Sequence, residues 1–374
     1  MIDREVKVLS VVVAALLAVG VVMAYSVSAP SARTLSTSAK FGRHLLYLAF
    51  ALSAAWGVWV CGARRLLAAT PYVVGVVAFL LLLCYVPPLG RRIRGAARWL
   101  AVGPLHLQPS EMAKIAAVLV AARFAALRGD ADLRKLLLRG FAPIAVLVAL
   151  ILAEPDFGTA VFVSGAAAVL LFVAGARARH LALTFGVACL LTLPVAALKF
   201  GHVRRRVALF MNPGSDGRGK GYQIRQSLIA IGSGGVAGRG MGASRQKLMF
   251  LPDRDTDFIF AIYAEETGFL GTMTILVLFA AYVVLGSRIA LATDDPSMRV
   301  LAFGAAFMPA AQAFLNIAVV TAVLPTKGIS LPFISFGGSS LLVCCAWFAL
   351  LVSVAYGGEG TCGFWSQPAE RAVT

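Results

Sequence analysis

The sequence predicts an all-α polytopic membrane protein with about ten transmembrane helices and two long extracytoplasmic loops. Hydrophobic residues make up 60% of the 374 residues and charged residues only 14%, and the mean hydropathy is +0.85. Soluble globular domains carry about 25% charged residues, so this balance excludes an ordinary soluble protein. Apolar runs of about 20 residues, the length needed to cross a bilayer, recur along the chain.

Ten apolar runs follow one another. The first lacks a small-residue cleavage site after a short apolar core, so we interpret it as a membrane anchor rather than a cleaved signal. The fifth and sixth are short and are separated by the polar turn Glu154-Pro155-Asp156-Phe157-Gly158. The predicted spans are 7–27, 44–62, 66–86, 108–127, 141–155, 158–176, 179–199, 258–287, 299–323 and 332–356. They form a single transmembrane domain, 1–356, which a short polar cytoplasmic tail, 357–374, follows.

The short connections between the spans set the expected orientation. Basic residues gather in three of them, which are Arg64-Arg65, the stretch from Arg128 to Arg139, and Arg177 with Arg179. Because short cytoplasmic loops are enriched in lysine and arginine, these connections are predicted to be cytoplasmic. With ten spans both termini are then cytoplasmic, and the two long loops, 87–107 and 200–256, lie outside.

The long loop 200–256 is strongly basic, with ten lysines and arginines against three aspartates. Positive charge on the outside indicates an anionic lipid head group or a pyrophosphate as ligand, and simple attraction to anionic membrane lipids is the alternative. The stretch from Gly232 to Ala237 fits the dinucleotide pattern G-x-G-x-x-G/A, which is meaningful only between a strand and a helix. We interpret its glycines instead as positions where the backbone approaches a ligand closely or forms an anion-binding nest.

Charged residues at or inside apolar runs are candidates for function, and Asp257, Glu111 and Lys114 are the ones singled out here. Asp257 opens the eighth run, directly before Phe258, so it is expected at the membrane–water boundary. Partial desolvation there makes a carboxylate a better base, whereas the alternative role is a helix N-cap, for which aspartate is favoured. Glu111 and Lys114 are three residues apart, so they share a helix face and can pair. Such a pair marks either a functional site or a structural link between helices.

Five short blocks stand in a fixed order along the chain. They are Gly95-Ala96-Ala97-Arg98-Trp99 with Gln108-Pro109-Ser110-Glu111 and Lys114; Glu154-Pro155-Asp156-Phe157-Gly158-Thr159; Gln226-Ser227 through Gly240; Leu251-Pro252 with Thr256-Asp257-Phe258-Ile259-Phe260-Ala261; and Leu324-Pro325-Thr326-Lys327-Gly328 through Leu331-Pro332-Phe333, ending Gly337-Gly338-Ser339-Ser340. In this order they resemble the SEDS proteins (shape, elongation, division and sporulation), the FtsW/RodA family of bacterial cell-wall polymerases. The second block is similar to the family's Q-P-D-x-G-T.

Two short segments look more like the division branch of the family, FtsW, than like the elongation branch, RodA. These are Gln246-Lys247-Leu248 and Pro325-Thr326-Lys327-Gly328. Two departures accompany the resemblance. Asp255 stands where the family usually has histidine, and Phe336 replaces the tyrosine of its Y-G-G-S-S ending. Asp255 would either raise the proton affinity of Asp257 by like-charge repulsion or stay solvated and inert.

The resemblance implies polymerisation of peptidoglycan glycan strands from lipid II, at the outer face of the bacterial cytoplasmic (inner) membrane. The acceptor's sugar hydroxyl attacks the anomeric carbon of the donor and lipid pyrophosphate leaves, so a base and positive charge are needed. One inverting displacement requires no second carboxylate as nucleophile. Asp257 is the candidate base. The candidate substrate-binding residues are Arg98, Glu111, Lys114, Asp156, Arg205, Arg206, Gln226, Ser233 and Lys247.

The alternative function is a flippase that moves lipid-linked sugar across the bilayer. Such a transporter needs charged groups deep in several spans and a cavity between repeats. The charge here gathers in the outer loops, which favours the enzyme. The expected partners are lipid II, membrane lipids, a class B penicillin-binding transpeptidase and other division membrane proteins, with no nucleic acid. The sequence shows no dedicated cluster of metal ligands, so we predict no metal site of the protein's own and leave open a divalent cation, Mg²⁺ or Mn²⁺, at the pyrophosphate.

Overall fold

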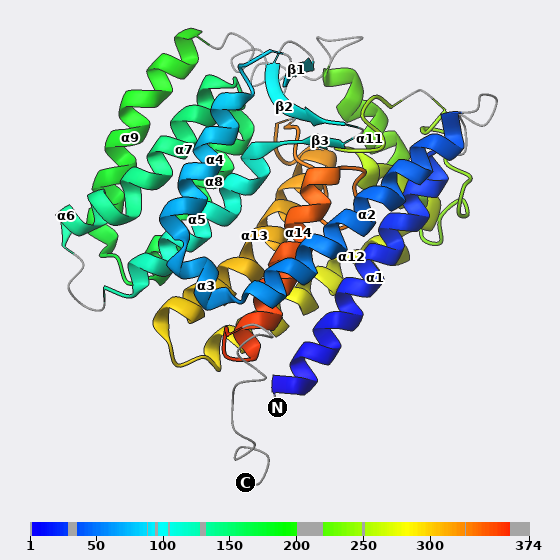
Figure 1. Ribbon diagram of the computed structural model, residues 1–374. Coiled ribbons are helices and arrows are strands. Elements are labelled where there is room, and N and C mark those ends of the chain that lie inside the picture. The colour runs from blue at the N-terminus through cyan, green and yellow to red at the C-terminus, as the bar shows by residue number, and fades with distance from the viewer. Residues whose placement is uncertain are drawn as a thin grey trace, which may run out of the picture.

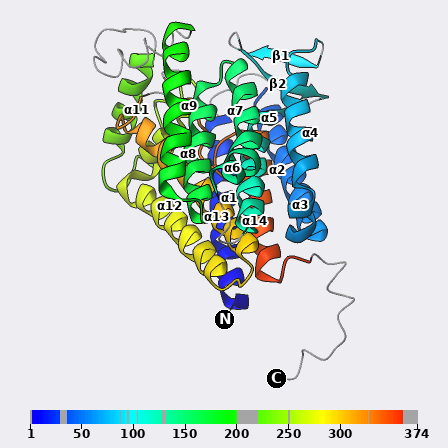
Figure 2. The ribbon, with the colours of Figure 1, turned by 90° about the vertical axis from the view of Figure 1, so that its left-hand side faces the viewer.

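Apolar helices pack side by side into one bundle, which a small sheet covers at one end (Figures 1 and 2). The computed structural model describes residues 2–28, 36–87, 89–93, 96–103, 105–127, 132–199, 220–248, 251–325 and 327–359. The first half contributes α1 (Ile2–Ser28), α2 (Ser36–Cys61), α3 (Ala63–Ala68), α4 (Thr70–Leu83), α5 (Pro109–Ala125), α6 (Leu133–Lys135), the π-helix Leu136–Phe141 and α7 (Ala142–Ala153). The second half contributes α8 (Phe157–Val173), α9 (Ala178–Lys199), α11 (Lys220–Gly234), α12 (Ile259–Leu291), α13 (Pro296–Val320) and α14 (Gly338–Ala355).

Six helical segments of the described chain are long and apolar enough to cross a membrane, and three shorter helices are strongly apolar. Their surfaces fit a lipid environment, because large apolar side chains such as Val11, Trp56 and Phe79 point outward and are more than half exposed. Contiguous apolar surface of this kind is rare on soluble proteins. The protein is therefore a multi-pass membrane protein, as the composition predicts.

Each of the ten predicted spans contains an observed helix, with shifts at the ends. The third span is divided into α3 and α4 at Ala69, directly before a helix start that carries a proline in its first turn. The predicted break at 154–158 is confirmed, because α7 ends at Ala153 and α8 begins at Phe157. The break occurs where proline and aspartate replace apolar residues.

The two regions predicted as long loops contain regular structure instead. Residues 87–107 include an antiparallel sheet of order β1-β2-β3, formed by β1 (Gly90–Ile93), β2 (Ala96–Val102) and β3 (Leu105–Leu107). Residues 200–256 include α11. Neither element was expected, because strands of three to seven residues and a polar, glycine-containing helix give no clear apolar period. Their stability comes from packing on the bundle.

The core of the bundle lies around α13 and α14, which contact α5, α12 and each other. Large side chains such as Trp347 and Tyr282 are fully buried there, and the Tyr282 hydroxyl donates a hydrogen bond of 3.1 Å to the carbonyl of Ala305. α14 is packed on most sides, because 72% of its 18 residues are buried. α2 lies at the rim, where 22% of its most apolar 18-residue stretch is buried. α5 contacts both α8 and α14, and the sheet contacts α5 through β2 and α14 through β3 (Figure 1).

The start of α1 and the end of α14 lie at the same end of the bundle, opposite the sheet (Figure 1). The amide of Arg64 donates a 2.9 Å hydrogen bond to the carbonyl of Gly358, which ties the end of α14 to the short helix α3. An even number of crossings accounts for this arrangement. Two ends of the molecule are thereby defined, which we call the sheet end and the terminal end.

Candidate active site at the sheet end of the bundle

Asp257 lies at the sheet end in the segment that leads into α12, and its side chain is half-buried. The backbone around it is held by the segment before α14 and by α13. The three successive carbonyls of residues 255–257 accept hydrogen bonds from the amide of Phe336 at 2.9 Å, the Ser335 hydroxyl at 2.7 Å and the Asn316 side-chain amide at 2.8 Å. With these carbonyls fixed, the Asp257 carboxylate projects from a rigid support.

The Asp257 carboxylate faces Gly328. A Cβ added at Gly328 would lie 3.3 Å from Asp257 Oδ2, so the missing side chain leaves room directly in front of the carboxylate. The neighbouring Lys327 passes over Gly158, where an added Cβ would lie 3.0 Å from Lys327 Cε and 3.5 Å from Asp156 Oδ1. The segment around Gly328 thus brings Lys327 and Asp156 to the same region of the sheet end as Asp257.

The N-cap position of α12 falls on Phe258, which makes no side-chain capping hydrogen bond. Asp257 therefore stands one residue before the cap.

Asp156 organises the turn between α7 and α8. Its carboxylate is the N-cap of α8, accepting from the Thr159 amide at 3.2 Å and from the Thr159 hydroxyl at 2.8 Å. The Gln108 side-chain amide approaches the same carboxylate at 3.5 Å. These donors hold the buried carboxylate in a fixed orientation, which suits it to position a nearby cation.

Arg98 reaches this turn from β2. Its guanidinium lies 3.7 Å from the Asp156 carboxylate, donates to the Glu154 carbonyl at 3.0 Å and also donates to the Pro155 carbonyl. The side chain is 29% exposed. The sheet therefore serves to carry this arginine over the helix ends, and the planar guanidinium fork fixes the turn 154–156.

Glu111 and Lys114 form the ion pair that their spacing predicts, with 2.6 Å between Lys114 Nζ and Glu111 Oε1. Lys114 also donates to the side-chain oxygen of Gln312, Oε1, at 2.6 Å, and the side-chain nitrogen of Gln312, Nε2, donates to the Ser330 backbone carbonyl at 2.9 Å. One turn further along α13, Asn316 donates to the carbonyl of Asp257. The pair is thus connected, through two amides of α13, to the support of Asp257.

Gln312 and Asn316 were missed by sequence reasoning. Both are buried polar residues within the apolar span of α13, and their spacing of four places them on one helix face. Asn316 also donates to the Ile329 carbonyl at 2.6 Å. Two amides on one face of a membrane span were the signal that could have found them, because such groups need partners in an apolar environment.

Other predicted site residues lie elsewhere. Gln226 and Ser233 lie on α11, where the Ser233 hydroxyl donates to the Ala230 carbonyl at 3.0 Å. Lys247 is 3% exposed, and its ammonium lies 2.9 Å from Glu266 and 3.0 Å from the Ser26 hydroxyl. Arg205 and Arg206 fall outside the described residues. Substrate binding by these residues stays a prediction, which for Lys247 would require its ammonium to leave Glu266.

The glycines near Gly232 serve a contact within the protein. A Cβ at Gly234 would overlap the Ala264 carbonyl of α12, and a Cβ at Gly238 would overlap the Glu266 carbonyl. At Gly238, φ is +80°, which favours glycine. The close backbone approach predicted for this stretch is therefore present, but the partner at these two positions is α12 rather than a ligand.

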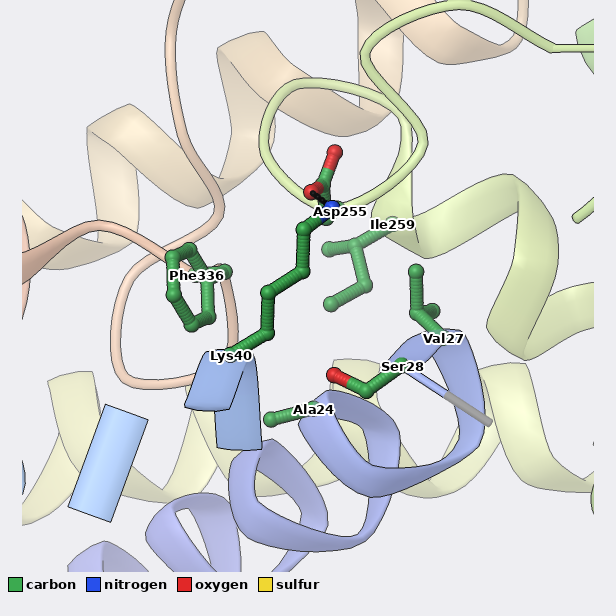
Figure 3. A pocket seen from close by; sticks show the side chains of 7 residues that line it. All are labelled: Ala24, Val27, Ser28, Lys40, Asp255, Ile259 and Phe336. Atoms are coloured by element: carbon green, nitrogen blue, oxygen red, sulfur yellow. Dashed lines mark ion pairs between the residues drawn. The ribbon is translucent and has the colours of Figure 1, made fainter. Parts of the chain in front are cut away.

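Asp255 faces α2. Its carboxylate lies 3.9 Å from the Lys40 ammonium of α2, over Ile259 and Phe336 (Figure 3). The cavity between these side chains has a volume of about 10 Å³, enough for a single water and too small for a sugar. The acidic departure at this position is thus balanced by a lysine from another helix.

Glu154 is a buried ionisable group at the sheet end. It follows the last residue of α7, and its side chain is fully buried behind the Arg98-bound turn. Burial raises the pKa of its carboxyl to about 8, and the neighbouring Asp156 adds to the increase while Arg98 opposes it. Burial therefore favours the neutral form of this carboxyl at neutral pH.

Comparison with known families decides the relationship that the five blocks indicate. A family model described as the cell cycle protein family FtsW/RodA/SpoVE matches residues 7–359. The chain belongs to this family. The FtsW/RodA/SpoVE assignment covers every described element of the bundle, including α11 and the sheet.

Similar FtsW/RodA/SpoVE proteins include two named as probable peptidoglycan glycosyltransferase FtsW. The protein of Geobacter metallireducens is 40% identical over 300 residues, 78% of each chain. That of Aromatoleum aromaticum is 38% identical over 357 residues, 91% of this chain and 85% of the relative.

Two solved structures are similar over 94% of this chain. One chain belongs to a peptidoglycan synthase complex studied for the structural coordination of polymerization and crosslinking, with a TM-score of 0.75, 30% identity and 97% of that chain covered. The rod shape determining protein RodA of Thermus thermophilus has a TM-score of 0.66, 30% identity and 96% of its chain covered.

Proposed function

We propose that this chain is a peptidoglycan glycosyltransferase that polymerises glycan strands from lipid II and releases undecaprenyl pyrophosphate during cell division. Membership of the FtsW/RodA/SpoVE family and the names of its relatives support this activity. The observation that carries the proposal is the Asp257 carboxylate, half-buried on a backbone held by three hydrogen bonds and facing the open position of Gly328.

Asp257 acts as general base in this proposal. The acceptor sugar's 4-hydroxyl forms a bond to the anomeric carbon of the donor, and its proton passes to the Asp257 carboxylate. The bond between that carbon and the pyrophosphate oxygen breaks, and the electron pair leaves with the lipid pyrophosphate. One displacement inverts the α-linked donor into a β-linked product, so a single carboxylate suffices.

Lys327 and Arg98 supply positive charge for the pyrophosphate. Both belong to the sheet end, and the Asp156 carboxylate lies between them. In a site partly shielded from water, fixed cations stabilise a developing negative charge more strongly than they would in solution. Asp156 then sets their positions rather than contacting the leaving group.

A divalent cation fits this site only if the protein and the pyrophosphate coordinate it together. The described residues bring no three potential side-chain ligands together, whereas Mg²⁺ commonly takes one or two protein carboxylates and completes its shell with phosphate oxygens and water. Asp257 is the carboxylate placed to contribute. When bound, such an ion would neutralise charge on the pyrophosphate.

A crosslinking partner completes the proposal. The described residues form one helical bundle with a small sheet, and we assign peptide crosslinking to a separate protein. The similar chain from a peptidoglycan synthase complex in which polymerization and crosslinking are coordinated supports a transpeptidase of the class B penicillin-binding type. We also propose other division membrane proteins as partners. In the same proposal the chain lies in the inner membrane with both termini in the cytoplasm.

The test is polymerisation of purified lipid II by the purified chain, with and without its transpeptidase. Asp257→Asn is expected to lower the rate by about 10²–10⁴-fold, the usual effect of losing a general base. Asp253→Asn serves as the matched control, because Asp253 lies in the same segment and keeps Asp257 intact. Polymer made by Asp257→Asn at a rate within a few-fold of the parent would exclude the proposed role. Movement of lipid II across vesicles without polymer would favour the flippase alternative.

A further inference from the structure

Glu154 is a buried acid that the proposed reaction does not use. Its side chain is 0% exposed in the turn between α7 and α8. Neither carboxyl oxygen meets an N–H or O–H donor among the described residues. An ionised carboxylate whose nearest donor is the weak Cys84 thiol is costly in such a place, so the group must stay neutral or change its surroundings.

Four titratable or charged groups influence this carboxyl. Cys84 and Tyr85 stand at the end of α4, Arg98 comes from β2, and Asp156 belongs to the same turn. The thiol is a weak donor, and burial raises the pKa of Cys84 to about 12, so it brings no charge. Arg98 is the cation among these four, and Asp156 already attracts it at 3.7 Å.

Arg98 is shared between the backbone of the turn and Asp156. It donates to the carbonyls of Glu154 and Pro155 while it faces the Asp156 carboxylate. A negative charge on Glu154 would repel Asp156 and attract the same guanidinium. The neutral form of Glu154 therefore favours the Arg98–Asp156 pair, and the ionised form competes with it.

We propose that Glu154 is a positioning residue whose neutral, protonated carboxyl keeps the Arg98–Asp156 pair in place. The proposal rests on the proposed function in one respect, since that function puts Arg98 at the pyrophosphate. Loss of the proton would draw Arg98 toward Glu154 or open the turn to water. Asp156, the N-cap of α8, would then lose the neighbour that aligns it with Gln108 and Lys327.

The first measurement is thermal unfolding of the purified parent and of Glu154→Gln between pH 5 and pH 9. The raised pKa of Glu154 means that the folded state holds a proton which the unfolded state releases above its ordinary pKa. Stability is therefore full at low pH, falls as the pH rises toward about 8, and is then constant. Glutamine cannot ionise, so the Tm of the parent should fall relative to that of Glu154→Gln over this range.

The matched control is Glu5→Gln. Glu5 lies at the terminal end, where its carboxylate pairs with Arg288 at 3.1 Å, so it reports what the loss of an ordinary partly exposed carboxylate does. Its Tm difference from the parent should not follow the Glu154→Gln pattern. A Tm difference between the parent and Glu154→Gln that is the same at every pH would overturn the proposal.

The second measurement uses the parent and Glu154→Asp, and it keeps the test valid if Glu154→Gln does not fold. Infrared difference spectra between pH 6 and pH 9 should show the loss of a protonated carboxyl band as Glu154 ionises. Glu154→Asp, which retains an ionisable group, should keep such a band. Absence of any band in the parent would overturn the proposal.

The third measurement is the rate of lipid II polymerisation against pH. Above its midpoint the protonated fraction of Glu154 falls about tenfold per pH unit, so the ratio of the parent's rate to that of Glu154→Gln should fall in the same way. If the pH–rate profiles of the parent and Glu154→Gln are parallel while Asp257→Asn is inactive at every pH, only the role of Glu154 is overturned. An active Asp257→Asn would overturn the proposed function, and the Tm and infrared measurements would still decide the state of Glu154.

Discussion

At the residue scale, the buried charges of this protein occur in pairs or near pairs, and Lys247 is the clearest case. Its ammonium and the Glu266 carboxylate are 4% and 0% exposed and lie 2.9 Å apart. Removing one partner of a buried pair leaves a charge without compensation, which typically costs about 3–5 kcal/mol. The same position was predicted from sequence to bind pyrophosphate, and the two roles predict different outcomes for one substitution.

Lys247→Gln is expected to lower the Tm of the purified protein strongly, because Glu266 is left buried and unpaired. The double variant Lys247→Gln with Glu266→Gln should recover much of the loss. Arg245→Gln is the control, since Arg245 is an exposed basic residue of the same loop. A Lys247→Gln protein with the parent's Tm and weaker use of lipid II would instead support direct substrate binding.

At the element scale, the loop after α11 supplies hydrogen-bond acceptors at a break in α12. Gly268 interrupts α12 with a φ of +69°. Beyond the break, the amides of Phe269 and Leu270 donate to the carbonyls of Gly235 and Val236, at 2.9 and 3.2 Å. Hydrogen bonds that α12 loses at the break are thus replaced by the loop. This exchange needs backbones in direct contact, which explains the glycines of α11 and its loop.

Gly234→Ala should destabilise the protein, because its Cβ would overlap the Ala264 carbonyl, and backbone cannot yield as a flexible side chain would. Gly232→Ala is the matched control in the same helix. Nothing lies within 4 Å of a Cβ at Gly232, and alanine favours a helix by about 1 kcal/mol over glycine. We expect a lower Tm for Gly234→Ala and an unchanged or higher Tm for Gly232→Ala. Equal Tm values would contradict the close contact between α11 and α12.

At the scale of the whole molecule, the proposed orientation puts the sheet end outside and the terminal end in the cytoplasm. A cysteine-free background allows a test with single cysteines at two exposed positions. Leu89→Cys lies at the sheet end and Asp294→Cys in the turn between α12 and α13 at the terminal end (Figure 1). In cells with a permeable outer envelope, an impermeant thiol reagent should label Leu89→Cys, whereas Asp294→Cys should react only after lysis of the inner membrane.

The reverse labelling pattern would place Asp257 on the cytoplasmic side. Polymer would then be made on the wrong side of the membrane for a cell wall, so the orientation and the proposed function would fail together. Labelling of both positions in intact cells would indicate a leaky preparation, which a cytoplasmic marker protein detects.

The sequence by itself determined the class of protein, the ten spans, the Glu111–Lys114 pair and the family. Each of these depends on local information. An apolar run is driven into a bilayer by its own composition, a pair three residues apart shares a face on any helix, and a motif is read along the chain. The sheet and α11 escaped prediction because they gain their stability from the bundle beneath them.

Only the tertiary structure decided what the polar residues contact. Asn316 supports Asp257 across 59 residues, Arg98 fixes a turn 56 residues away, and Lys247 pairs with Ser26 and Glu266 inside the bundle. The burial of Glu154 likewise depends on α4 and β2. The pattern of apolar residues along the sequence does not reveal such contacts. They depend on where helices far apart in sequence end and on which way each side chain then points.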